Sequence, residues 1–141
     1  MSVKSQLLLV LLALAIGSAR ADQVPTIEVF KLTSQTVTDF VGATVYDVDG
    51  LEVILSKLSE GLPASPELAE QMAKARFEGL GAVGTAKLEE AAKVLGQTAH
   101  YGLTKAPAVV FDGKYVVYGE SSVAKALKIY RAWSAKNGGV Q

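Results

Sequence analysis

Apolar and polar positions in the N-terminal half of the chain predict two short strands joined by a turn and a short helix. Residues 26–32 alternate apolar and polar side chains, as a half-buried strand does. Residues 33–36, Thr-Ser-Gln-Thr, favour a turn or a helix start. Residues 37–42 carry apolar side chains at spacings of three and four before a glycine, which predicts a short helix. Residues 43–46 predict a second strand.

A β-hairpin is the clearest pattern in the chain. Residues 108–111 and 114–118 are rich in β-branched and aromatic side chains. Asp112-Gly113 between them is a hairpin signal, because both turn positions need a positive φ. Pro107 precedes the first of these strands, where its missing amide hydrogen is tolerated.

Helical spacing of apolar residues fills the middle of the chain. It predicts a helix over residues 51–58 and a second one, running to residue 77, that Ser65 caps and that Pro66 begins. A third pattern over residues 88–95 would end at Gly96. After the hairpin, Ser121 or Ser122 would cap a last helix through residue 133, whose apolar stripe packs on the sheet.

The first residues predict an exported protein. Lys4 is followed by an uninterrupted apolar run over residues 7–16 and by Ala-Arg-Ala at 19–21, the pattern of a cleaved signal peptide. The run is shorter than the ~20 residues that a membrane-spanning helix needs. We therefore expect a signal peptide over residues 1–21, one domain over residues 22–136 and a flexible tail over residues 137–141, in a soluble periplasmic protein with no membrane span after cleavage.

Composition excludes several functions. The chain has no cysteine, so thiol chemistry, disulfides and cysteine-based metal sites are impossible. Basic and acidic side chains balance over the whole chain, and loss of the signal leaves a slight acidic excess. Such a balance does not predict direct binding of nucleic acid.

Two motifs suggest ligands but have simpler explanations. Asp47, Asp49 and Gly50 resemble part of a calcium loop, yet the matching first and last positions are Val45 and Ser56, so a turn is favoured. Residues 79–84 match the dinucleotide-binding Gly-x-Gly-x-x-Gly. That motif must follow a strand, whereas the preceding residues have a helical pattern, so we interpret it as a break between two helices.

No catalytic group, metal or cofactor is predicted. His100 is the only histidine, and one imidazole makes neither a catalytic triad nor a zinc site. We interpret it as a helix-end residue. The acidic pairs Asp47 with Asp49 and Glu89 with Glu90 are interpreted as solvated faces.

The order of the elements resembles a minimal thioredoxin-like domain: strand, short helix, strand, long helical segment, hairpin, helix. Residues 105–113 resemble the cis-proline loop and following strand of that fold. The resemblance implies an α/β fold with a central mixed sheet of about four strands flanked by helices, and a cis bond before Pro107.

Four segments resemble a family of small exported proteins encoded on bacterial integrating conjugative elements: residues 99–102, 109–113, 116–119 and 130–133. The similarity extends over residues 27–133. It implies a periplasmic accessory protein beside the conjugative type IV secretion apparatus.

Because the chain has no cysteine, this resemblance implies a binding role and not a redox role. Redox-active thioredoxin relatives carry Cys-x-x-Cys where this chain has residues 33–36, so only the peptide-presenting shape would remain. The expected partner is a protein component of the conjugative transfer machinery, and the expected protein is not an enzyme. The residues expected to bind the partner are Thr33, Ser34, Tyr101, Ala106 and Pro107.

Two alternatives stay open. The chain could be a structural scaffold that assembles through its helical face or through residues 79–84. It could also be an enzyme of unrecognised chemistry, for which a pocket holding His100 and a carboxylate is the minimum requirement. The tyrosines near the hairpin, Tyr101, Tyr115 and Tyr118, could form a recognition surface or pack as ordinary sheet residues.

Overall fold

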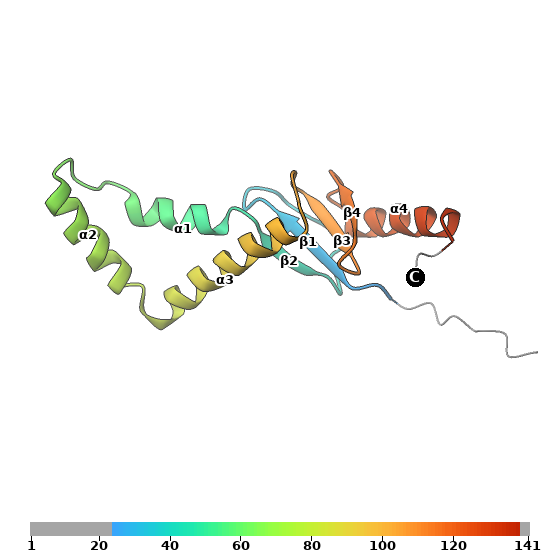
Figure 1. Ribbon diagram of the computed structural model, residues 1–141, viewed down its shortest axis with the longest axis horizontal. Helices are drawn as coiled ribbons and strands as arrows, with labels where there is room; N and C mark the ends of the chain where they lie inside the picture. Colours follow the sequence, from blue (N-terminus) through green and yellow to red (C-terminus); the bar gives the residue numbers. More distant parts are fainter. Residues whose placement is uncertain (1–23, 139–141) are drawn as a thin grey trace, which may run out of the picture.

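A computed structural model describes residues 24–138 as an α/β protein (Figure 1). The predicted signal peptide and residues 139–141 of the predicted tail lie outside these residues. A four-stranded mixed sheet with strand order β2-β1-β3-β4 forms the centre. Its strands are β1 (Ile27–Lys31), β2 (Thr44–Asp47), β3 (Ala108–Phe111) and β4 (Tyr115–Tyr118).

The pairing of the strands places the hairpin at one edge of the sheet. β1 lies parallel to β2 and antiparallel to β3, which lies antiparallel to β4. Asp112 and Gly113 have φ of 52° and 66°, as the hairpin signal requires. The Lys114 amide donates to the Phe111 carbonyl at 3.1 Å to close the turn. The predicted hairpin is confirmed, and the Ala106–Pro107 peptide bond before it is cis.

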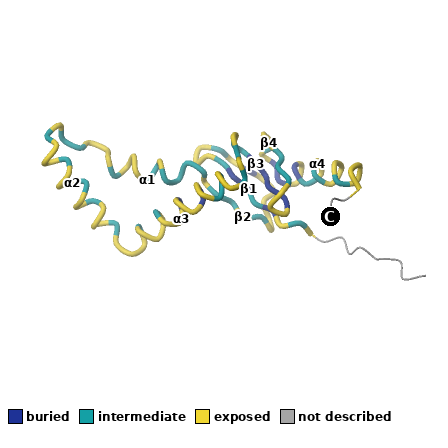
Figure 2. Tube along the Cα trace, viewed as in Figure 1, coloured by how far each residue is buried: buried dark blue, intermediate teal, exposed yellow. Residues whose placement is uncertain are grey.

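Side chains on the two faces of the sheet form two core layers. On one face, Val29, Val109 and Phe111 pack beneath α4 (Val123–Lys136). On the other face, Phe30 and Val110 form a second cluster with residues near the end of α3 (Gly81–His100). The buried residues gather at the sheet (Figure 2). Because β1 and β3 contribute to both layers, the central strands hold the two faces together.

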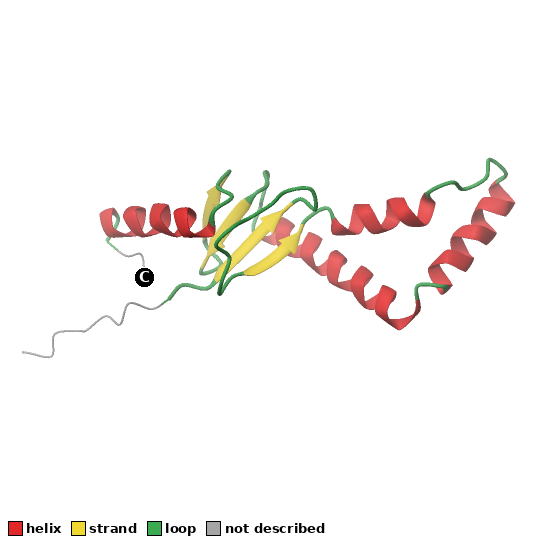
Figure 3. Cartoon of the chain, turned by 180° about the vertical axis from the view of Figure 1, so that it is seen from behind, coloured by secondary structure: helices red, strands yellow, loops and turns green. Residues whose placement is uncertain are grey.

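Three helices form a triangular arm that projects from the sheet (Figures 1 and 3). α1 (Gly50–Ser59) leads outward, α2 (Pro66–Glu78) crosses, and α3 returns. No residue of α1 or α2 is buried. We call residues 50–90 the arm. Its base is closed tightly, since a Cβ placed on Gly50 would lie 3.7 Å from the Cβ of Ala91.

The predicted helix over residues 37–42 is wrong. This segment is extended at Thr38, whose amide donates to Ser121 at 2.9 Å and whose carbonyl accepts from Val123 at 3.0 Å. Its backbone groups therefore pair with the start of α4 rather than with one another. Val37 nevertheless joins the core beneath α4.

The prediction that Gly96 ends a helix is also wrong, because α3 continues to His100. Residues 79–84 do break the helical path, as expected. α2 ends at Glu78, and Gly81 turns the chain with φ of 62°. A helix and not a strand precedes the glycines, so the turn that holds a dinucleotide is not formed. Within residues 24–138, no helix is long and apolar enough to cross a membrane.

Candidate functional site

The turn after β1 lies against the loop that precedes β3. The Gln35 backbone amide donates to the Leu32 carbonyl at 2.9 Å, and the Leu32 backbone amide donates to Gln35 Oε1 at 2.9 Å. Gln35 Nε2 donates to the Ala106 carbonyl at 3.1 Å, which ties the two segments together. Thr33 and Ser34 thus lie on a turn that is fixed beside Ala106 and Pro107.

Asp49 fixes the same turn from the opposite direction. Its Oδ1 accepts from the Thr33 amide at 2.7 Å and from the Thr33 hydroxyl at 2.8 Å. Burial would raise the pKa of Asp49, but these hydrogen bonds outweigh burial and hold its pKa below the usual value. The Asp-Val-Asp-Gly segment is therefore a turn that leads into α1 and anchors the neighbouring loop.

Pro107 connects the site to the edge strand. Its carbonyl accepts from the Gly119 amide at 2.9 Å, directly after β4 ends. Ala106 and Pro107 are half-buried, whereas Thr33 and Ser34 are exposed. We call these four residues, together with Gln35, the turn site.

A shallow hollow of about 250 Å³ adjoins the turn site on the α3 side of the sheet. It is lined by Phe30, Leu32, Val48, Thr98, Leu103, Thr104, Lys105 and Ala106. An extended segment lying beside Ala106 would have room for one apolar side chain here.

Tyr101 lies apart from the turn site. Its hydroxyl donates to Glu28 Oε2 at 2.7 Å, and its ring packs edge-on against Phe30 with centroids 5.8 Å apart. The hydroxyl would lie 3.6 Å from a Cβ on Gly113, at the hairpin end of the sheet. The hydrogen bond to Glu28 raises the pKa of Tyr101. Gln97 donates to the same carboxylate, so Tyr101 belongs to a polar cluster between α3 and the sheet.

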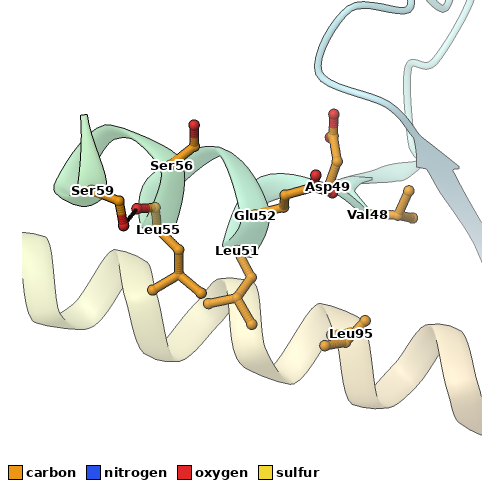
Figure 4. A pocket seen from close by; sticks show the side chains of 8 residues that line it. All are labelled: Val48, Asp49, Leu51, Glu52, Leu55, Ser56, Ser59 and Leu95. Carbon is orange, nitrogen blue, oxygen red and sulfur yellow. Dashed lines mark hydrogen bonds between the residues drawn. The ribbon is translucent and has the colours of Figure 1, made fainter. Parts of the chain in front are cut away.

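A larger hollow of about 460 Å³ lies between α1 and α3 (Figure 4). Leu51 and Leu55 point from α1 toward α3, where Leu95 lies. Leu55 and Leu95 remain 47% and 50% exposed, so these helices meet without sealing the space between them.

The other polar residues that the sequence singled out have ordinary surroundings. Asp47 forms an ion pair with Lys31 at 2.5 Å. His100 is the exposed last residue of α3, and its ring centroid lies 5.5 Å from that of Tyr101. Among the described residues, no group of three or more histidines and carboxylates could hold a metal ion.

Gln35 and Asp49 are the positioning residues that sequence reasoning missed. The sequence predicts only that Gln35 lies in a turn and that Asp49 belongs to a turn and to a solvated acidic pair. The signal for Gln35 was a long amide side chain three residues beyond the end of a strand, where it can reach back to the chain. Its contact with Ala106, 71 residues away, has no local sequence signal.

Fold and site together define a cysteine-free α/β protein with a mixed four-stranded sheet, a helical arm and a braced turn beside a cis-proline loop. Residues 24–136 match the family described as "Protein of unknown function (DUF1525)", and the chain belongs to that family. No curated protein and no solved structure matches the chain.

Proposed function

We propose that this protein is a non-enzymatic, periplasmic accessory protein of an integrating conjugative element, with a thioredoxin-like fold. Its role is to bind a protein component of the conjugative type IV secretion apparatus at the turn site. The strand order, the hairpin after a cis proline and the turn beside that proline support the thioredoxin-like assignment. Since the chain has no cysteine, dithiol exchange cannot be its activity.

The observation that carries this proposal is the contact between Gln35 and Ala106. It holds an exposed turn and an extended loop side by side, next to the hollow of about 250 Å³. An extended peptide binds such a surface through backbone hydrogen bonds and places a side chain in the neighbouring pocket. The arrangement is suited to holding a segment of a partner.

Site-specific photocrosslinking in cells that carry the element tests the proposal. A photoreactive residue at Ser34 or Ala106 is expected to trap a component of the secretion apparatus. The matched control places the same residue at Lys93 on the exposed side of α3. Crosslinks from position 93 to secretion components, with none from positions 34 and 106, would contradict the assignment of the turn site.

A second candidate function is assembly through the arm, because several of its large apolar side chains are exposed. Val83 is 72% exposed and Phe77 is 51% exposed. Under this alternative, Val83→Asp abolishes the complex recovered from cells, whereas Ala82→Asp on the neighbouring position and Pro107→Ala leave it intact. Under the leading proposal, Val83→Asp leaves the crosslinks from position 34 unchanged.

A further inference from the structure

β4 is an edge strand with outward-facing backbone groups. Residues of an antiparallel strand face their neighbour alternately. Because the Gly119 amide donates to Pro107, Val117 and Tyr115 also direct their backbone groups toward β3. Val116 and Tyr118 therefore direct theirs outward. Within residues 24–138, no strand pairs with this outer edge of β4.

Edges of this kind are usually protected by a charge, a proline or a bulge. β4 reads Tyr-Val-Val-Tyr and contains none of these, apart from Lys114 just before it. An uncharged edge that keeps its regular register with β3 is ready to accept another strand.

An aromatic hollow of about 330 Å³ runs beside this edge. Tyr115 and Tyr130 line it with Trp133, whose ring centroid lies 5.0 Å from that of Tyr115. Trp133 is 41% exposed, and Ile129 in the same wall is 51% exposed. Large apolar side chains left open at a groove mark a binding surface more often than a solvated one.

The helix that forms one wall of this hollow is basic, and the carboxylate of Asp112 is engaged by the Tyr130 hydroxyl at 3.0 Å. α4 carries Lys125, Lys128, Arg131 and Lys136 and no carboxylate. Lys114 lines the hollow itself. A second copy of this chain on the same edge would bring these positive groups together, which disfavours a symmetric pair.

We propose that the outer edge of β4 binds an extended, acidic peptide segment of another protein as a fifth strand. Val116 and Tyr118 supply the backbone hydrogen bonds. Apolar side chains on one face of the segment enter the hollow beside Trp133, and acidic side chains at the ends of the segment approach Lys114 and the basic side chains of α4. An anionic lipid headgroup would pair with the basic side chains, but it would leave the outward backbone groups of β4 without a partner strand. This surface is separate from the turn site, so either can fail without the other.

The test uses purified protein and a fluorescein-labelled peptide, Glu-Val-Glu-Phe-Glu-Val-Glu, with Lys-Val-Lys-Phe-Lys-Val-Lys as its matched control. Fluorescence anisotropy is expected to show binding of the acidic peptide only. Val116→Pro removes an outward amide without removing a β3 hydrogen bond, and we expect it to weaken binding at least about tenfold. Val116→Ala shortens the side chain but keeps the amide, and it should bind within about threefold of wild type.

Trp133→Ala and Lys114→Glu keep the proposal testable if Val116→Pro does not fold, as judged by circular dichroism. Each is expected to weaken binding of the acidic peptide by about fivefold or more. Unchanged affinity in folded Val116→Pro, or in both of these variants, overturns the proposal. It is also overturned if sedimentation shows a dimer that Val116→Pro dissociates. Peptide-independent binding to phosphatidylglycerol vesicles that requires Lys114 and Trp133 would assign the surface to lipid instead.

Discussion

Gln35 does more than its place in a polar turn suggests. Its side chain is both acceptor and donor, bonding the Leu32 amide on its own turn and the Ala106 carbonyl across the site. A carboxylate of the same length can accept but cannot donate. A glutamate at position 35 would therefore keep the hydrogen bond within the turn and lose the one to the cis-proline loop.

Gln35→Glu is expected to keep the turn and release Ala106, and to lower the free energy of unfolding by roughly 1–2 kcal/mol. Gln35→Ala loses both contacts and should cost at least as much. Urea denaturation measures both. Thr36→Ala, at an exposed neighbouring position, is the control and should change stability by less than about 0.5 kcal/mol. Wild-type stability for Gln35→Glu would mean that the bond to Ala106 is not needed to hold the site.

Asp49 predicts a pH dependence. Its folded pKa lies below the unfolded one, so its carboxylate stabilises the fold above an unfolded pKa of about 4. That contribution is lost as pH falls through the lowered folded pKa. Asp49→Asn should therefore be less stable than wild type by roughly 1 kcal/mol at pH 7, and the difference should vanish in acid.

Denaturation of both proteins between pH 7 and pH 2 checks this expectation, with Glu52→Gln as the control for net charge. A difference that stays constant down to pH 2 would show that the Thr33 hydrogen bonds do not depend on the charge of Asp49.

The helices of the arm have an unusual distribution of burial. A helix in water is marginal below ~12–15 residues unless its apolar face packs. α1 and α2 are 10 and 13 residues long and bury no residue. Among the three helices, buried residues occur only in the C-terminal half of α3, at Ala91 and Val94. The arm should therefore open without unfolding the sheet.

Amide hydrogen exchange should reveal this difference. Amides of α2 are expected to exchange roughly a hundredfold faster than those of β1 and β3, because local opening exposes them. Mass spectrometry of peptide fragments measures both regions in one sample, and the C-terminal half of α3 is the internal control. Equal protection of α2 and β3 would mean that arm and sheet unfold as one unit.

The elements that were predicted correctly are those with local signals. Pro66 and Ser65 mark the start of α2, and the positive φ values of Asp112 and Gly113 match their place in a hairpin. The helix over residues 37–42 failed because Thr38 pairs with Ser122, a contact no local pattern encodes. Gly96 failed as a helix end since tertiary packing of neighbouring Val94 carries α3 past it.

The residues of the candidate site also divide into those that local sequence patterns predict and those that long-range contacts position. Thr33, Ser34, Ala106 and Pro107 were expected together, and the structure brings their segments together through Gln35. Tyr101 was included because of its proximity to the hairpin in sequence. Its direction depends on Glu28, which is 73 residues away and could not be inferred from spacing.

Two core layers share the central strands of the sheet. Phe30 and Phe111 are both fully buried but lie on opposite faces of the sheet. Since each layer packs against the same two strands, loss of either should unfold both. Trp133 on α4 then reports on the integrity of the α3 face as well.

Phe30→Ala and Phe111→Ala are each expected to cost about 3–5 kcal/mol of unfolding free energy, as buried phenylalanines usually do. Phe77→Ala is a matched control, since Phe77 is 51% exposed, and it should cost less than about 0.5 kcal/mol. Trp133 fluorescence during urea denaturation should shift to the same lower midpoint in both core variants. An unshifted fluorescence midpoint for Phe30→Ala would separate the two layers.

Because Gly50 and Ala91 approach each other closely, the two ends of the arm lie side by side. The chain leaves at the start of α1, and α3 passes back within van der Waals contact of that point. What lies between can lengthen, shorten or be exchanged without moving a strand out of register, because closing a longer loop adds little entropy cost. Length differences among members of the family should therefore concentrate in the arm. A foreign domain should also be tolerated there.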